Sequence, residues 1–362
     1  MKNFGLDRVF VFSSKAGIVF IIMFMLGCSS SSSPEIWAEG KPKHHTQNGF
    51  RNYPVVPEPP ALGVGFYMRR IESSFNLPVV PKSHYLSEED AITQLNNLNN
   101  KNTITWIGQS TLLLKLNGKF ILTDPFFSKY ASPFPFGPQR FVNPGISPKS
   151  LPTIDIIIIS HNHYDHLDEQ FIKSLPNKEN IHVFVPLKLK SFFTDRGYNF
   201  VHEFDWYETY SIYNFKFTAL PIVHYSGRGI GNKNKSLWCS WAISTPFGKY
   251  FFIGDSAYSP TLFKEIGNNF GSFDFAMLTI GTYGNRKYGV NNHTTPEEAI
   301  IIAKEINAKT LLGMHWGTIE LSDENPWEPP KRFKESALKA GFLPEKVWVM
   351  KIGETRLLPG KK

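Results

Sequence analysis

The stretch Ser160-His161-Asn162-His163-Tyr164-Asp165-His166-Leu167-Asp168 decides how this sequence is interpreted. Four side chains that can bind a metal, those of His161, His163, Asp165 and His166, lie within six residues. They follow the β-branched run 154–160, which is typical of a fully buried strand. A short loop after a strand can wrap such side chains around a cation, and imidazole with carboxylate suits Zn²⁺. The pattern therefore predicts a metal site.

Strand-forming segments come before this loop. Segments 103–106 and 111–116 either alternate apolar with polar residues or are continuously apolar, as strands do. Asn117-Gly118 then predicts a hairpin turn that leads into a third strand, 119–123. That strand ends at Asp124-Pro125. A helix is expected near 87–98.

A later part of the chain repeats this arrangement. Strands are expected over 237–244 and 249–253, and the segment 248–255, which ends in Gly254-Asp255, resembles 118–124. Farther on, Thr295-Pro296-Glu297-Glu298 has the residues of a helix N-cap and capping box. Two strand-rich halves, each followed by helices, predict an α/β fold in which two sheets pack face to face with helices outside.

The N-terminus has the features of an export signal. A positively charged start precedes an apolar run from Ala16 to Gly27, which is too short to span a bilayer. Met25-Leu26-Gly27-Cys28 resembles a bacterial lipobox, which implies cleavage before Cys28 and lipidation of its thiol; the alternative is an uncleaved anchor. We therefore expect a lipid-anchored protein of the bacterial cell envelope that faces away from the cytoplasm. The expected organisation is a signal peptide at 1–27, a tether and arm at 28–100, and a catalytic domain at 101–362.

Composition narrows the partners. With 41% hydrophobic residues the chain can form a large core, and 15% aromatic residues argue against extensive disorder. The net charge is +8, but there is no Lys/Arg run or nucleic-acid motif. We expect attraction to a lipid surface and no nucleic-acid partner, and leave open the oligomeric state, including a homodimer. Only two cysteines are present, so lipidation of Cys28 would leave Cys239 without a disulfide partner.

The motif at 161–166 resembles that of the metallo-β-lactamase superfamily, whose fold is an αββα sandwich of two mixed sheets. The resemblance implies further ligands after later strands, at the matching positions His224, Asp255 and His315. It also implies two zinc ions. One would be held by His161, His163 and His224, the other by Asp165, His166 and His315, with Asp255 bridging them. Such paired metals lower the pKa of water towards about 7. Asp124 would fix the 161–166 loop by hydrogen bonds, the alternative being a simple Asp-Pro turn.

A closer resemblance is to the N-acyl-phosphatidylethanolamine phospholipase D family. It covers roughly 100–358 and, more weakly, the arm from Phe50. The motifs that carry it are Thr105–Gly108, Leu122–Pro125, Gly137–Phe141, Phe204–Trp206, Trp238–Trp241, Asn292–Ala299, His315–Thr318 and Glu328–Pro330, together with the metal motif itself. The resemblance implies zinc-dependent hydrolysis of a membrane phospholipid to phosphatidic acid and an N-acylethanolamine.

Several positions are expected to contact substrate on the same grounds. Tyr164 and His293 match active-site residues of the family, and the resemblance gives them catalytic roles beside Asp255. His293 also precedes the capped helix, whose free N–H groups favour an anion, although a structural loop histidine is the alternative. Arg228 and Gln109 are further substrate-binding candidates, and Gln109 stands where the family usually has His. The other histidines, 44, 45, 84, 182 and 202, are interpreted as surface or structural residues.

Two alternatives to a phospholipase D remain. The first keeps the metal pair but hydrolyses another ester, such as a lactone or a soluble phosphodiester. The second is a non-catalytic binding lipoprotein on a retained fold, which loss of ligands would have favoured; none is lost.

Overall fold

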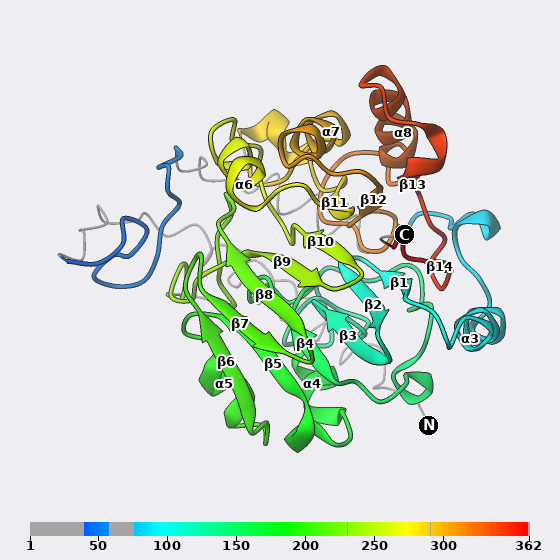
Figure 1. The fold of residues 1–362 in the computed structure, drawn as a ribbon, viewed down its shortest axis with the longest axis horizontal. Coiled ribbons are helices and arrows are strands. Elements are labelled where there is room, and N and C mark those ends of the chain that lie inside the picture. The colour runs from blue at the N-terminus through cyan, green and yellow to red at the C-terminus, as the bar shows by residue number, and fades with distance from the viewer. Residues whose placement is uncertain (1–39, 58–75, 230, 290, 361–362) are drawn as a thin grey trace, which may run out of the picture.

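The computed structural model describes residues 40–57, 76–229, 231–289 and 291–360, and the chain forms two seven-stranded sheets with helices outside (Figure 1). The proposed signal peptide and Cys28 lie outside these residues. The first sheet has the strand order β14 (Thr355–Leu357), β1 (Thr103–Gly108), β2 (Thr111–Leu116), β3 (Lys119–Thr123), β4 (Ile156–Ile158), β5 (His182–Pro186) and β6 (Phe200–Phe204).

The second sheet has the same size and a similar construction. Its order is β13 (Val347–Trp348), β12 (Leu311–Met314), β11 (Phe275–Thr279), β10 (Gly248–Phe252), β9 (Ser240–Thr245), β8 (Phe215–Leu220) and β7 (Thr209–Ile212). In both sheets an antiparallel hairpin, β2–β3 or β9–β10, is followed by a parallel neighbour, β4 or β11. The repeat expected from the sequence is therefore a structural one, and both sheets are mixed.

Side chains alternate between two cores. Leu112 and Leu114 of β2 join a large apolar cluster that also includes residues of the second sheet, such as Phe217 and Trp241. Leu113, between them, joins a second cluster formed with the helices outside the first sheet. This alternation follows from the two-residue period of a strand, and it makes both faces of the first sheet buried.

Helices cover the outer faces. The first sheet is covered by α3 (Glu88–Asn97), α4 (Glu169–Ser174) and α5 (Lys190–Thr194), whose apolar residues belong to the second cluster. The second sheet is covered by α6 (Leu262–Phe270), α7 (Pro296–Glu305) and α8 (Pro329–Lys339) (Figure 1). Short 3₁₀ turns occur at Lys82–His84, Pro148–Ser150, Lys178–Asn180, Gly284–Tyr288 and Pro344–Lys346. None of the helices within the described ranges is long and apolar enough to cross a bilayer.

The predicted elements are present with altered bounds. The helix expected near 87–98 is α3, capped by Ser87, and α7 begins with the expected capping box at Thr295. The strand predicted over 154–160 is limited to β4, because Ser160 turns away and donates its N–H to Asp124. The strand predicted from Leu237 begins at Ser240, since Leu237 and Cys239 donate their N–H groups to loops of the first sheet.

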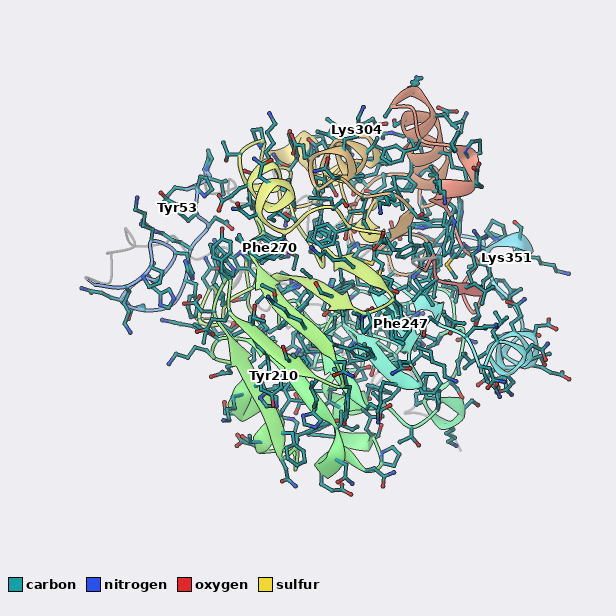
Figure 2. The ribbon with its side chains drawn as sticks, in the orientation of Figure 1. Tyr53, Tyr210, Phe247, Phe270, Lys304 and Lys351 are labelled. Carbon is teal, nitrogen blue, oxygen red and sulfur yellow. The ribbon has the colours of Figure 1, made fainter. Side chains whose placement is uncertain are left out.

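The N-terminal arm, residues 40–57, has no regular structure but is fixed to the domain. It lies on the left in Figure 1, and Figure 2 shows its Tyr53 on the opposite side of the view from Lys351. Phe50 is buried in the large cluster between the sheets, and its N–H donates to the carbonyl of Asn234. The arm is therefore part of the folded unit.

Candidate metal centre

The candidate ligands lie where the strands of both sheets end. His161 follows β4, His224 follows β8, Asp255 follows β10 and His315 follows β12 directly. The ends of these strands meet at one rim of the sandwich, where polar side chains can converge without disturbing the core. All seven predicted ligands are brought together here in two clusters, which also include His163, Asp165 and His166.

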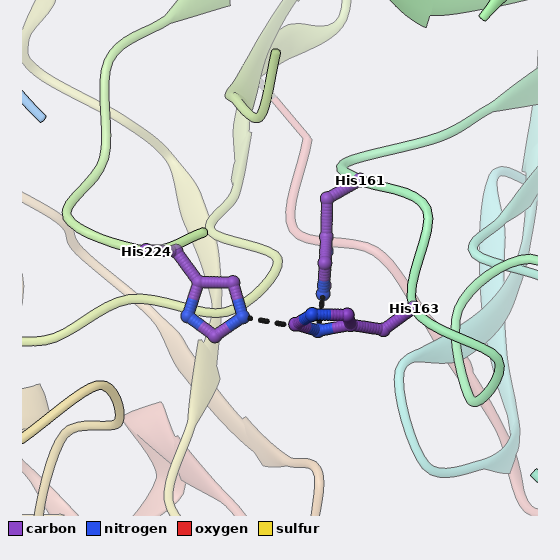
Figure 3. Close-up of side chains that lie close together, drawn as sticks. All are labelled: His161, His163 and His224. Carbon is purple, nitrogen blue, oxygen red and sulfur yellow. Dashed lines mark hydrogen bonds between the residues drawn. The ribbon is translucent and has the colours of Figure 1, made fainter. Parts of the chain in front are cut away.

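The first cluster consists of three imidazoles. The Nε2 atom of His161 lies 2.8 Å from Nδ1 of His163, which lies 3.3 Å from Nε2 of His224 (Figure 3). Burial lowers the pKa of His163 to about 3 and that of His224 to about 4, so both rings are neutral near pH 7. Neutral imidazoles offer a lone pair, which is the form that binds a metal.

The second cluster contains two carboxylates and two imidazoles. His166 Nε2 lies 3.0 Å from Asp255 Oδ2 and 3.4 Å from Asp165 Oδ2, and His315 Nε2 lies 3.2 and 3.4 Å from the same two oxygens. Burial alone would lower the pKa of His315, but Asp255 and Asp165 outweigh it and raise that pKa to about 9. Two buried carboxylates thus demand positive charge, which a divalent cation supplies.

Asp255 lies between the clusters. Its Oδ2 atom is 4.0 Å from His161 Nε2 and 3.9 Å from His224 Nε2, in addition to its closer contacts with the second cluster. The glycine before it, Gly254, has φ +64, and a Cβ there would lie 2.4 Å from Cβ of Ser160. Asp255 can therefore approach the 161–166 loop because glycine precedes it, and its position suits a bridging ligand.

Three of the histidines have a hydrogen-bond partner at Nδ1, the ring nitrogen that faces away from the cluster. His224 Nδ1 contacts the carbonyl of Asn292 at 3.0 Å, and since a carbonyl only accepts, this nitrogen carries the proton. His224 Nε2 then presents a lone pair to the other nitrogens of its cluster. His315 Nδ1 contacts Thr282 Oγ1 at 3.2 Å, and His161 Nδ1 contacts Ser160 Oγ at 2.8 Å. The Nδ1 partners fix the orientation of the rings, so that the Nε2 lone pairs face one point. This arrangement fits a cation at that point.

Asp124 lies behind the ligands, as the sequence analysis expected. Its carboxylate accepts hydrogen bonds from the Ser160 N–H at 2.6 Å and the Ser160 hydroxyl at 2.5 Å, and contacts His166 Nδ1 at 2.7 Å. It therefore fixes both ends of the 160–166 loop, and the alternative of a simple Asp-Pro turn is wrong.

The structure corrects the substrate-binding role given to Gln109. This residue is 2% exposed, and its Nε2 donates to Asp165 Oδ2 at 2.9 Å and also lies 2.9 Å from His315 Nε2. Its backbone has φ +53, which places the side chain under the second cluster. Gln109 thus orients two ligands and does not line the cleft.

Arg228 borders the cleft, so its substrate-binding role stays a prediction. Its Nη1 donates to the carbonyl groups of Asn162 at 3.0 Å and Leu167 at 2.5 Å, and its guanidinium lies 3.9 Å from the centre of the Tyr164 ring. These contacts hold Nη1 on the metal loop, whereas the buried Nη2 has no hydrogen-bond partner among the described residues. Tyr164 likewise donates its hydroxyl hydrogen to the Arg228 carbonyl at 2.9 Å, so its oxygen can only accept from a ligand.

His293 faces the centre. Its ring lies 5.3 Å from those of His224 and His315, and Nδ1 is 3.7 Å from Asp255 Oδ2. This buried Nδ1 has no hydrogen-bond partner among the described residues, which fits contact with a bound molecule. The expected anion site at the adjacent helix start is not open, however, because Thr295 and Glu298 cap each other's N–H groups.

A cleft with a volume of about 280 Å³ opens over both clusters. His163, Asp165, Asp255 and His293 form its floor, and Tyr164 borders it. The residues of its more apolar part are Ala131, Pro138, Tyr225 and Leu321. The clusters are therefore accessible to a small polar group with an apolar extension.

Sequence reasoning missed the residues that hold His224. Asn52 of the arm accepts the His224 N–H at 3.0 Å and donates its Nδ2 to the His224 carbonyl at 2.8 Å. The Asn292 carbonyl and Thr282 also escaped notice, although each contacts a ligand. Neither periodicity nor spacing signals contacts across 172 residues, and only the family-like segment around Asn292 gave a hint.

Comparison with known proteins agrees with this geometry. Residues 119–316 match the β-lactamase superfamily domain. An N-acyl-phosphatidylethanolamine-hydrolyzing phospholipase D 1 of Caenorhabditis elegans is 35% identical over 64% of this chain and 68% of its own length. The mitochondrial N-acyl-phosphatidylethanolamine-hydrolyzing phospholipase D of Saccharomyces cerevisiae is 35% identical over 69% of this chain and 55% of its own length.

Solved structures show the same fold. An isothiocyanate hydrolase from Delia radicum gut bacteria superposes with a TM-score of 0.56 at 18% identity, covering 72% of this chain and 100% of that one. CmlA, a diiron β-hydroxylase from Streptomyces venezuelae, superposes with a TM-score of 0.54 at 18% identity, covering 72% of this chain and 54% of that one. The fold, the two ligand clusters and the similarity to these relatives agree. The chain belongs to the β-lactamase superfamily and is a metal-dependent hydrolase similar to the N-acyl-phosphatidylethanolamine-hydrolyzing phospholipases D.

Proposed function

We propose that this hydrolase is a zinc-dependent phosphodiesterase of phospholipase D type, which converts N-acyl-phosphatidylethanolamine to phosphatidic acid and an N-acylethanolamine at a membrane surface. The observation that carries the proposal is the pair of ligand clusters around Asp255 beneath an open cleft, in a chain 35% identical to relatives named for this reaction. A soluble phosphodiester or a lactone is the alternative substrate.

Two zinc ions are the proposed cofactors. His161, His163 and His224 would hold one, Asp165, His166 and His315 the other, and Asp255 would contact both. When bound, the pair would activate water at neutral pH and neutralise negative charge on phosphate oxygens. The three-nitrogen cluster and the more anionic second cluster differ in charge, so the two sites should differ in affinity.

The chain's own groups would orient the substrate. Burial holds the pKa of His293 well below its usual range, so the ring is neutral and can donate one N–H while its other nitrogen accepts. Its Nδ1 faces the cleft floor without a partner in the part of the chain described, and is placed to contact a phosphate oxygen. Tyr164 borders the same space.

The size of the cleft suits only part of a phospholipid. A volume of about 280 Å³ can hold a phosphate with its neighbouring atoms, and it lies just below the about 300–1,000 Å³ of pockets that enclose a drug-sized ligand. The diacylglycerol chains would therefore stay outside, in the membrane. The apolar wall formed by Pro138, Tyr225 and Leu321 would contact the portion next to the phosphate.

Export and lipid anchoring at Cys28 belong to the same proposal, because they would bring the cleft to its substrate. The apolar run 16–27 and the lipobox-like segment before Cys28 support it. In cells fed a labelled fatty acid, the wild type should carry the label and Cys28→Ala should accumulate as an unprocessed, unlabelled precursor. An unchanged mature mass in Cys28→Ala would contradict anchoring without affecting the proposed chemistry.

A substrate panel tests the proposed reaction. Metal-loaded protein is incubated with vesicles of N-acyl-phosphatidylethanolamine, phosphatidylethanolamine and phosphatidylcholine, and separately with lactones and cyclic phosphodiesters, and products are identified by mass. Phosphatidic acid released together with an N-acylethanolamine is expected. Turnover of a lactone with no product from any phospholipid would reject the phospholipase assignment.

A further inference from the structure

A second group of metal-binding side chains lies outside the catalytic centre. His44 Nε2 is 2.6 Å from Asp205 Oδ1, and His45 Nε2 is 2.7 Å from Asp205 Oδ2. The three ligand atoms all lie within 4.8 Å of one another. None of these residues contributes to the clusters around Asp255, and both histidines were expected from the sequence to be surface or structural residues.

The backbone is shaped to bring the two neighbouring histidines to one point. Successive side chains of an extended strand point to opposite sides. Here the His45 N–H donates to the Pro42 carbonyl at 2.9 Å, which closes a turn over 42–45. The imidazole rings consequently lie 4.6 Å apart at 67° and direct both Nε2 atoms to the Asp205 carboxylate. Asp205 follows β6 and is itself held, since its Oδ1 accepts the Trp206 N–H.

The surroundings are those of a shielded site with one open side. The side chains of His44, His45 and Asp205 are 8%, 16% and 17% exposed. One face of His44 stacks on Trp206, with ring centres 4.1 Å apart at 24°. Two imidazole nitrogens and one carboxylate oxygen are the usual protein ligands of zinc, and a water molecule can take a fourth position from the exposed side.

We propose that His44, His45 and Asp205 form a third metal site, which binds a borderline divalent transition metal such as Zn²⁺. The Nε2 atoms, brought together by the turn, would be its nitrogen ligands, and Asp205 would balance part of its charge. A metal would replace the two imidazole-to-carboxylate hydrogen bonds with shorter, stronger bonds, and would join the arm to the loop after β6.

The site would fasten the arm that orients a catalytic ligand. Seven residues beyond His45, Asn52 holds both backbone groups of His224 and accepts the Nε1–H of Trp238 at 3.1 Å. Trp206, which stacks on His44, donates its own Nε1–H to the Trp238 carbonyl at 2.7 Å. The third metal would therefore act as a positioning element, without touching the substrate.

Metal stoichiometry tests the site. Asp205→Asn and the double variant His44→Gln/His45→Gln keep groups that can form hydrogen bonds but remove metal ligands. His182→Gln/His202→Gln is the matched control, because these two histidines also lie beside each other, with ring centres 5.7 Å apart, but belong to no ligand group within the described residues. Each protein is stripped with chelator, titrated with Zn²⁺ alone, and analysed for bound metal after desalting, with circular dichroism to check folding.

The expected result is one zinc equivalent fewer in both site variants than in the wild type and the control, with the remaining equivalents unchanged. Hydrogen exchange gives a second measurement in the unaltered chain. Adding Zn²⁺ should slow exchange at the Arg51 amide, which donates to the His44 carbonyl, and do so much less in Asp205→Asn. Equal zinc content in the wild type and both site variants, or equal slowing of the Arg51 amide by Zn²⁺ in the wild type and Asp205→Asn, would overturn the proposal.

Discussion

The Nδ1 atom of His166 lies 2.7 Å from Oδ2 of Asp124, and both side chains are fully buried. The carboxylate accepts a hydrogen bond from the imidazole Nδ1–H, so Nε2 is left with its lone pair to face Asp165 and Asp255. Asp124 also accepts two hydrogen bonds from Ser160, immediately before His161. One carboxylate therefore sets the orientation of ligands in both clusters.

Replacing Asp124 by Asn should weaken metal binding without removing a ligand. The amide can accept only at its oxygen, so at least one of the bonds to Ser160 and His166 is lost. Loss of a side chain that hydrogen-bonds a metal ligand lowers metal affinity by about 10–100-fold. Competition with a chromophoric chelator would measure the loss. Asp155→Asn is the control. Asp155 directly precedes β4 and accepts hydrogen bonds from Lys119 and Phe120, far from the ligands. Equal effects of the two substitutions would contradict the assigned role.

Asp255→Ala should impair both clusters. Its Oδ2 atom lies 3.0–4.0 Å from a nitrogen of four ligand histidines, two in each cluster. Elemental analysis should find loss of more than one metal equivalent. His163→Ala, which removes a ligand of the first cluster only, should lose about one. If Asp255→Ala lost no more metal than His163→Ala, Asp255 would belong to a single cluster.

His293→Ala and Tyr164→Phe should retain metal but slow turnover. Neither side chain belongs to the two proposed ligand sets, although His293 lies within ligand distance of His224 and Asp255, and both border the cleft. A lost hydrogen bond to charge developing in the transition state costs about 10²–10³-fold in kcat. The effect of Tyr164→Phe should be smaller, because its hydroxyl hydrogen already bonds the Arg228 carbonyl. Loss of one metal equivalent in His293→Ala would make His293 a ligand.

His84 gives the stability a specific pH dependence. It is buried, contacts the Gly317 carbonyl through Nε2 at 2.7 Å, and burial lowers its pKa from 6.5 to about 4. Because the unfolded chain takes up a proton below pH 6.5 and the folded chain does not until about pH 4, this contribution to stability is complete above 6.5 and is lost between 6.5 and 4. The loss is about 3 kcal/mol at most.

Urea unfolding at several pH values, compared with His84→Gln, measures this contribution. Gln can keep the hydrogen bond to Gly317 but does not titrate, so its free energy of unfolding should fall less between pH 6.5 and 4. Other acid-sensitive groups, including the metal ligands, affect both proteins alike. Parallel pH profiles of the two proteins would show that His84 does not contribute.

The parts of the site that the sequence could predict are those with local signals. The 161–166 motif indicated the metal loop, and the resemblance between 118–124 and 248–255 indicated the two sheets. The strand before each ligand could also be predicted, because its pattern involves only neighbouring residues. Gln109 was assigned wrongly because its residue type suits a substrate, whereas the direction of its side chain depends on a tertiary contact with Asp165. The support that Asn52 gives His224 joins segments 172 residues apart and leaves no local pattern.

The proposed phosphodiesterase reaction depends on attack of water at phosphorus. Metal-loaded protein is incubated with N-acyl-phosphatidylethanolamine vesicles in water enriched in ¹⁸O, and the products are analysed by mass spectrometry. Cleavage of the bond between phosphorus and the ethanolamine oxygen predicts one heavy oxygen in phosphatidic acid and none in the N-acylethanolamine. Heavy oxygen in the N-acylethanolamine would mean attack at carbon, and would contradict the proposed phosphodiesterase chemistry.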